Sequence, residues 1–165
     1  MAAIDEVVEA NHQYVLTRGI RQLPRAPARR LAVVTCMDPR IVPTVALGLE
    51  EGDAHVIRNA GGRARDALRS LVISQRLLGT TEVAIIHHTD CDSLTFTNES
   101  LREKVLIDIG ADCRSMDFLP IVDVRQSVRD DIAFLRRSTL LHETTPIRGF
   151  VLDVASGHLT EVEQP

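Results

Sequence analysis

The stretch LAVVTCMDPR, residues 31–40, joins a continuous apolar run to three polar side chains and constrains the whole fold. Its apolar part predicts a strand that is buried on both faces, because apolar residues occupy successive positions. Pro39 cannot donate to a strand ladder, so we expect the strand to end near it. Cys36, Asp38 and Arg40 alternate, and on extended backbone they would point to the same side. A thiol, a carboxylate and a guanidinium at a strand end are more typical of a functional site than of a hydrophobic core.

Hydrophobic periodicity predicts strands and helices that alternate along the chain. Further strands are expected at residues 54–58, 82–89 and 148–159, the last with a turn at Ser156-Gly157. Helices are expected at residues 4–17, 43–49, 65–78 (ended by Gly79), 100–108 and 121–137, with connectors at 21–30 and 92–99. This alternation favours an α/β fold with a parallel sheet covered on both sides. We expect a single domain over residues 1–165, in which residues 1–30 form an N-terminal helix and a connector arm.

The composition argues against several functional classes. The chain has 165 residues, 44% hydrophobic and 25% charged, which is typical of a globular protein. A formal net charge of −4 and an aromatic content of 3% give no reason to expect nucleic-acid binding. No stretch approaches the roughly 20 apolar residues of a membrane helix, and MAAIDEVVEA at the start lacks the apolar core of a signal peptide. We therefore expect a cytoplasmic protein, without a membrane partner, whose thiols are reduced.

A second polar cluster, HHTDC at residues 87–91, ends another predicted strand. Ligands of open parallel sheets gather beyond the carboxyl ends of the strands, so both clusters should share one edge. His88 and Cys91 are separated by two residues, which allows both side chains to reach one metal ion. Cys36 would complete a soft set of two thiolates and one imidazole that suits zinc. Asp38 or a water molecule could supply the fourth ligand.

Each of these residues also has a plainer interpretation. A cysteine at a strand end is usually part of a core, so the metal site rests on the conjunction of residues rather than on any one. His87 competes with His88, but neighbours on a strand face opposite ways, and we expect His87 to pack or to contact the ligand shell. Cys113 has no obvious partner and is expected to be an idle or buried thiol.

The segment RNAGG, residues 58–62, has two possible interpretations. It lacks the GxGxxG fingerprint of a dinucleotide-binding loop and could simply be a turn before the next helix. Alternatively, its glycines let the backbone approach a ligand, and the helix that follows favours an anion at its N-terminus.

In combination, these motifs resemble the β-class carbonic anhydrases. Cys-x-Asp-x-Arg, Arg-Asn-Ala-Gly and His-x-x-Cys occur in the order of that family, at residues 36–40, 58–61 and 88–91. The similarity continues through ISQRLLGT (73–80), VDVRQSVR (122–129) and RGFVLDVASG (148–157), so it covers nearly the whole chain. It is strongest toward the small mycobacterial-type branch of the family.

The resemblance implies a zinc enzyme that interconverts carbon dioxide and bicarbonate through a zinc-bound hydroxide. One Zn²⁺ per subunit would be held by Cys36, His88 and Cys91, while Asp38 and Arg40 form the catalytic dyad. The family also implies a mostly parallel sheet flanked by helices, and a homodimer or a dimer of dimers.

The ligand charges explain why the dyad would matter. Two thiolates cancel the charge of Zn²⁺, and Asp38 as a fourth ligand would leave no open position, as in a structural site. Catalysis therefore requires Asp38 to leave the metal and pair with Arg40, whose planar fork suits a carboxylate. We expect a closed and an open form that exchange as Asp38 moves between zinc and Arg40.

Substrate contacts are expected from Asn59, Ala60, Gly61 and Asp92. Asp92 stands where the family commonly has glycine, and its carboxylate has two possible orientations. Turned inward it would repel bicarbonate, whereas turned to solvent it would cap the next turn. Asp92→Gly should separate the two.

Two rival functions are consistent with the same residues. A zinc site of this kind could hydrolyse carbonyl sulfide or carbon disulfide, since the shape of the pocket decides between these substrates. A non-catalytic, zinc-stabilised binding domain is the alternative from another class, and it would need neither Arg40 nor an open coordination position.

Overall fold

The computed structural model describes residues 2–163, which form an α/β fold around a five-stranded sheet with strand order β2-β1-β3-β4-β5. The strands are β1 (Leu31–Cys36), β2 (Ala54–Asn59), β3 (Glu82–His88), β4 (Ile147–Leu152) and β5 (Leu159–Glu161). The first four strands are parallel to one another, and β5 runs antiparallel to β4. The mostly parallel sheet is thus confirmed. The predicted turn before Leu159 is present, but the short strand after it is an element that the periodicity does not predict.

Most helices begin and end close to the predicted positions, although the one predicted at residues 43–49 already ends at Ala46. The helices are α1 (Ala3–Arg18), α2 (Pro43–Ala46), α3 (Ala64–Leu78), α4 (Asn98–Ile109) and α5 (Val124–Arg136), with 3-10 turns η1 (Ala60–Gly62) and η2 (Asp92–Leu94). Gly79 ends α3 in the left-handed conformation, as predicted. The start predicted for α5 at residue 121 is wrong, because the Asp123 carboxylate caps the helix and accepts from the Gln126 backbone N–H at 2.6 Å.

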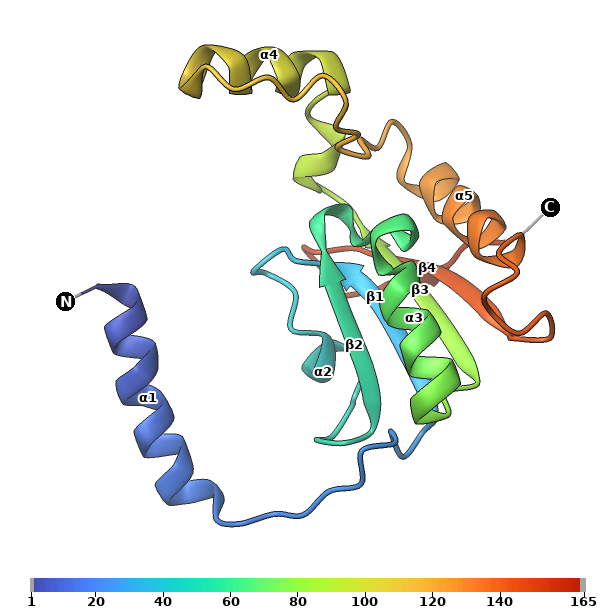
Figure 1. Ribbon diagram of the computed structural model, residues 1–165. Helices are drawn as coiled ribbons and strands as arrows, with labels where there is room; N and C mark the ends of the chain where they lie inside the picture. The colour runs from blue at the N-terminus through green and yellow to red at the C-terminus, as the bar shows by residue number, and fades with distance from the viewer. Residues whose placement is uncertain (1, 164–165) are drawn as a thin grey trace.

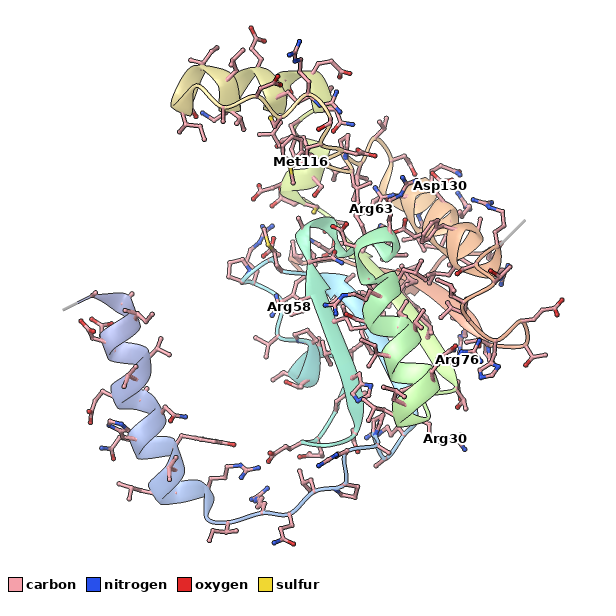
Figure 2. The ribbon with its side chains drawn as sticks, in the orientation of Figure 1. Arg30, Arg58, Arg63, Arg76, Met116 and Asp130 are labelled. Carbon is pink, nitrogen blue, oxygen red and sulfur yellow. The ribbon has the colours of Figure 1, made fainter. Side chains whose placement is uncertain are left out.

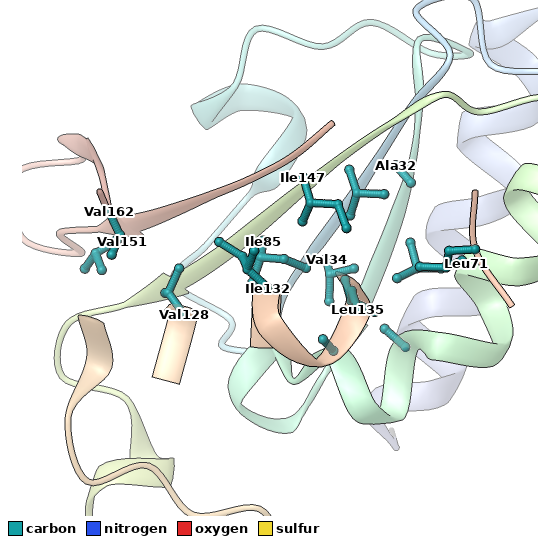
Figure 3. Packing of buried hydrophobic residues seen from close by; sticks show 14 residues of the cluster. Ala32, Val34, Leu71, Ile85, Val128, Ile132, Leu135, Ile147, Val151 and Val162 are labelled. Carbon is teal, nitrogen blue, oxygen red and sulfur yellow. The ribbon is translucent and has the colours of Figure 1, made fainter. Parts of the chain in front are cut away.

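One face of the sheet, the α3/α5 face, is covered by these two helices over its central strands (Figure 1). Leu71 of α3 and Ile132 of α5 are completely buried against Val34 and Ile85 of the central strands (Figure 3). Gly149 lets α5 lie directly on β4, because a Cβ there would be 2.2 Å from the Val128 side chain. This face holds the larger apolar core of the chain.

The opposite face, the α2 face, is covered only in part by this chain. Its core residues are Val33, Cys36, Ile41, Ile86, Cys91 and Leu152. Several apolar side chains around them are only half-buried, among them Val56, Phe150 and Leu159. The prediction of a sheet covered on both sides is therefore correct for the α3/α5 face and incomplete for the α2 face.

Two helices lie apart from the sheet (Figure 1). The helix predicted at residues 4–17 is present as α1, yet neither α1 nor α4 has a buried residue. Ile4 is 72% exposed, Leu16 78% and Ile107 74%, so this chain leaves the apolar residues of α1 and several of those of α4 uncovered. Across residues 2–163, no helix combines the length and the apolar character that crossing a membrane requires.

Candidate metal centre

The two polar clusters meet at the carboxyl edge of the sheet, between β1 and β3. The chain leaves β1 toward β2 on one side and leaves β3 toward β4 on the other, so this is the point at which the strand order reverses. Side chains beyond two such neighbouring strands face a common crevice. Arg63 marks this edge in Figure 2, while Arg30 and Arg76 lie at the opposite end of the sheet.

Cys36, His88 and Cys91 form a compact group of potential metal ligands. One ligand atom from each lies within 4.8 Å of the others, all three residues are buried, and the two sulfurs are 3.9 Å apart. Nδ1 of His88 lies 2.8 Å from the carbonyl oxygen of Thr89, to which a neutral imidazole would donate from Nδ1. Its Nε2 has no hydrogen-bond partner among the described residues. A buried imidazole nitrogen beside two thiols suits a soft divalent metal ion.

The electrostatics of the two cysteines also suit a cation. A hydrogen bond from the Cys91 thiol stabilises the Cys36 thiolate and lowers the pKa of Cys36, while the same bond raises the pKa of Cys91. Backbone groups of Asp38 and Gly61 also donate toward the Cys36 sulfur and lower its pKa further. The site therefore stabilises negative charge on sulfur within a buried environment.

Asp38 lies beside this group but is paired with Arg40. Arg40 donates from Nε to Oδ1 at 3.0 Å and from Nη2 to Oδ2 at 2.7 Å, and its backbone N–H donates to Oδ1 at 2.9 Å. The guanidinium lowers the pKa of Asp38 to about 2. Oδ2 of Asp38 is 3.8 Å from Nε2 of His88, so the carboxylate borders the three ligand atoms without belonging to their cluster.

The segment at residues 58–62 is a turn that backs onto the site. Asn59 clasps it, because its side-chain amide donates to the Arg63 carbonyl at 2.9 Å and its oxygen accepts the Arg63 N–H at 2.7 Å. Gly62 (φ 67°) lies so close to β1 that a Cβ would be 2.9 Å from the backbone nitrogen of Cys36. Both interpretations of the segment therefore hold in part: it is a turn, and its backbone approaches the ligand cluster.

Arg58 is a site residue that sequence reasoning did not single out. Its Nε donates to the Cys36 carbonyl at 2.9 Å, and its Nη2 donates to the Asp38 carbonyl at 2.6 Å. These bonds hold the chain as it leaves β1. The only signal in the sequence is the position of Arg58 at the head of the RNAGG segment.

His87 points to the α3/α5 face, away from the ligand cluster. Its Nε2 lies 3.2 Å from Oδ2 of Asp131, a residue of α5 that is only 3% exposed. Asp131 also accepts from Arg63 at 3.0 and 3.2 Å and from the Ala64 N–H at 2.9 Å. Burial alone would raise the pKa of Asp131, but these bonds outweigh it and lower the pKa. The sequence offered one signal for this network: Asp131 is a carboxylate within the apolar stripe of the helix predicted at residues 121–137.

A pocket of about 380 Å³ adjoins the ligand cluster. Of the expected substrate contacts, Ala60, Gly61 and Asp92 line it, whereas the side chain of Asn59 is engaged in the turn. Asp92 is exposed and begins η2, and its carbonyl accepts from the Thr95 hydroxyl at 2.7 Å.

The rest of the pocket is largely apolar. Its apolar walls include the side chains of Met37, Phe96, Leu101 and Phe118. Sequence reasoning missed these residues, because three of them come from the region around α4, which carries no recognisable motif.

Comparison with known proteins agrees with this geometry. A family model described as carbonic anhydrase matches residues 31–116, which include both polar clusters. The chain is 44% identical to beta-carbonic anhydrase 1 of Mycobacterium tuberculosis, over 98% of this chain and 99% of that protein. The crystal structure of a carbonic anhydrase from Streptococcus mutans superposes with a TM-score of 0.95 at 47% identity, covering 99% of both chains.

A more distant relative has a different name. The carbon disulfide hydrolase of Saccharolobus solfataricus is 30% identical over 98% of this chain and 89% of its own length. The two more similar proteins are named carbonic anhydrases, which are lyases. On its fold, its site and its similarity over almost its whole length, the chain belongs to the β-class carbonic anhydrase family.

Proposed function

We propose that this protein catalyses the reversible hydration of carbon dioxide to bicarbonate with one zinc ion held by Cys36, His88 and Cys91. The observation that carries the proposal is the group of three buried sulfur and nitrogen donors within 4.8 Å, bordered by a carboxylate and a pocket. When bound, zinc would supply the Lewis acidity that makes hydroxide available near neutral pH.

Asp38 would act on the proton of the reacting water. The Arg40 guanidinium lowers the pKa of Asp38 to about 2. Asp38 is therefore a carboxylate at neutral pH and can accept a hydrogen bond at Oδ2. That bond would orient the water toward carbon dioxide. Arg40 keeps the carboxylate paired and therefore away from the coordination position that the reaction needs.

The pocket suits a small apolar substrate. Phe96, Leu101 and Phe118 would exclude bulk water around carbon dioxide, and Gly61 brings the backbone to the pocket wall. Asp92 lies at the same wall, where the charged product bicarbonate would leave the site.

The same features support a second candidate, the hydrolysis of carbon disulfide or carbonyl sulfide. The specific observation is the 30% identity to a carbon disulfide hydrolase over nearly the whole chain. Linear apolar substrates of this kind resemble carbon dioxide in shape. Parallel assays of one purified preparation on carbon dioxide, carbonyl sulfide and carbon disulfide would decide which substrate has the larger kcat/KM.

The proposal includes a homodimer, or a dimer of dimers, and the exposed apolar surfaces support it. Residues 1–30 would serve as an arm, because the apolar side chains of α1 have no cover in this chain. The half-buried residues of the α2 face, including Phe150, are a second surface that another copy could cover. Exposed apolar side chains that gather on one surface are typical of an interface.

The central experiment is zinc analysis and stopped-flow carbon dioxide hydration on the same preparation. We expect one zinc per subunit and a measurable hydration rate. One zinc per subunit without hydration would instead favour a non-catalytic, zinc-stabilised binding domain.

The dyad is tested by Arg40→Ala. Loss of the guanidinium should allow Asp38 to occupy the metal, so turnover should fall by about 100-fold or more while the zinc content stays the same. Arg114→Ala is a matched control, since Arg114 makes the same local pair with Asp112 away from the site. Wild-type turnover in Arg40→Ala would refute the role of the dyad.

A further inference from the structure

We propose that Asp90 is a positioning residue that holds the Arg40 guanidinium in the orientation in which it pairs with Asp38. The inference rests on the proposed function, because it adds a residue to the same dyad. Asp90 lies in the HHTDC segment between two of the candidate zinc ligands, His88 and Cys91.

Asp90 binds the part of the guanidinium that Asp38 leaves available. Nη1 of Arg40 donates to Oδ2 of Asp90 at 2.5 Å, and Nη2 donates to the Asp90 carbonyl oxygen at 2.7 Å. Asp38 is bound by Nε and by Nη2. A guanidinium has five N–H donors, two of them on Nη2, so the two aspartates need not compete for the same hydrogen. Arg40 is therefore clamped from two sides.

The backbone of Asp90 is shaped for this contact. Its φ of 54° lies in the left-handed region, which aspartate tolerates better than most residues. In this conformation its carbonyl as well as its carboxylate accepts from Arg40. The contact joins segments that are 50 residues apart in the sequence, the loops that follow β1 and β3.

A second Asp–Arg pair in this chain shows which contacts form when no residue takes the place of Asp90. Asp112 and Arg114 have the same spacing and nearly the same local geometry as the dyad, with Nε–Oδ1 at 3.0 Å and Nη2–Oδ2 at 2.7 Å. Within residues 2–163, Arg114 pairs with Asp112 alone, and its side chain is 88% exposed against 46% for Arg40. The Asp-x-Arg spacing therefore suffices to form the pair, and the second clamp distinguishes the dyad.

The second clamp has a consequence for the exchange between the closed and open forms. If Asp38 moves to the metal, Arg40 keeps its bonds to Asp90 and stays where Asp38 can return to it. Without Asp90, a half-exposed arginine would gain rotamer freedom, and the entropy lost on re-forming the pair would favour the closed form. Asp90 thus acts through Arg40 and needs no contact with substrate.

Two variants separate the charge of Asp90 from its backbone. Asp90→Asn removes the charge and keeps a residue that tolerates a positive φ, while Asp90→Gly removes the whole side chain and suits the same φ. Asp90 lies on an exposed loop, so the fold should persist in both variants. Asp112→Asn is the matched control, because it removes the acid of the reference pair.

The first measurement uses the metal-free protein. The exchange of the Arg40 Nε–H with water is followed by ¹⁵N NMR, with the signal assigned through Arg40→Lys. We expect slow exchange in the wild type, roughly tenfold faster exchange in Asp90→Asn, and a larger increase in Asp90→Gly. Asp112→Asn should change the Arg114 signal and leave that of Arg40 unaltered.

The second measurement is carbon dioxide hydration by the zinc-loaded variants at one neutral pH. The kcat should fall severalfold in Asp90→Asn and further in Asp90→Gly, with unchanged zinc content and KM, and Asp112→Asn should match the wild type. Unchanged Arg40 exchange, or faster exchange with an unchanged kcat, would overturn the inference. An inactive wild type that still shows slow, Asp90-dependent exchange would refute the proposed function and leave the clamp on Arg40 established.

Discussion

The two faces of the sheet differ in what covers them. On the α3/α5 face, residues such as Leu71 and Ile132 are completely buried by helices of the same chain. On the α2 face, a helix of four residues leaves Phe150 and Leu159 half-buried. The candidate metal centre lies on the α2 side, since Cys36 and Cys91 belong to its core. The chain thus separates a face that its own helices cover from one that holds the candidate metal centre beside apolar side chains that are only half-buried.

Neighbouring histidines in β3 show how the two faces cooperate. His88 reaches the ligand cluster, and His87 reaches Asp131 on the other face. Asp131 in turn binds Arg63 at the end of the turn that backs onto Cys36. The helix-covered face therefore fixes the strand and the turn that carry the site on the opposite face.

The largest effect is expected from Asp131→Asn. Because the change leaves Arg63 buried without its counter-ion, the free energy of unfolding should fall by about 3–5 kcal/mol. Chemical denaturation of both proteins measures it. Asp130→Asn, one residue earlier and exposed, is the control and should stay within about 0.5 kcal/mol of the wild type. Equal losses in the two variants would contradict a special role for the buried network.

The difference in stability between the wild type and Asp131→Asn should depend on pH in a definite direction. The pKa of Asp131 is lower in the folded protein than in the unfolded chain. Its contribution to stability is therefore complete above the ordinary carboxyl pKa of about 4 and is lost as the pH falls below it. The difference between wild type and Asp131→Asn should shrink in acid.

A smaller effect should separate two leucine truncations. Leu71→Ala on the α3/α5 face should cost about 2–5 kcal/mol, because it leaves a cavity in a closed core. Leu47→Ala on the α2 face removes the same atoms from a half-buried position and should cost about 1 kcal/mol. If a second copy covers that face, the cost of Leu47→Ala should increase with protein concentration. Equal, concentration-independent costs would erase the distinction between the faces.

The smallest effect on the subunit itself is expected from removing residues 2–18. Since α1 has no buried residue, the far-ultraviolet circular dichroism should lose only the helical signal of the removed segment. The effect should appear instead in sedimentation velocity, as a shift from dimer toward monomer. Unchanged association would mean that the arm does not contribute to the proposed dimer.

Spacing along the chain is sufficient to predict several features of this protein. The apolar run at residues 31–37 is buried at positions 32–36, as its pattern predicts, while Leu31 is half-buried and Met37 is exposed. Alternation along β3 assigns His87 and His88 to opposite faces, and the Asp-x-Arg spacing is enough to pair Asp38 with Arg40. The pair of Asp112 and Arg114 forms in the same way without a site around it.

The folded structure adds contacts between distant segments that the spacing of residues does not predict. It places Asp131 behind His87 and supplies the apolar walls of the pocket, whereas the approach of Cys91 to Cys36 was already expected from the sequence. It also shows that α1 and the α2 face have apolar surface that this chain does not cover. The physical reason is that spacing sets only which side chains share a face of one element. The distance between elements depends on strand order and on close backbone contacts, which no local pattern of residues specifies.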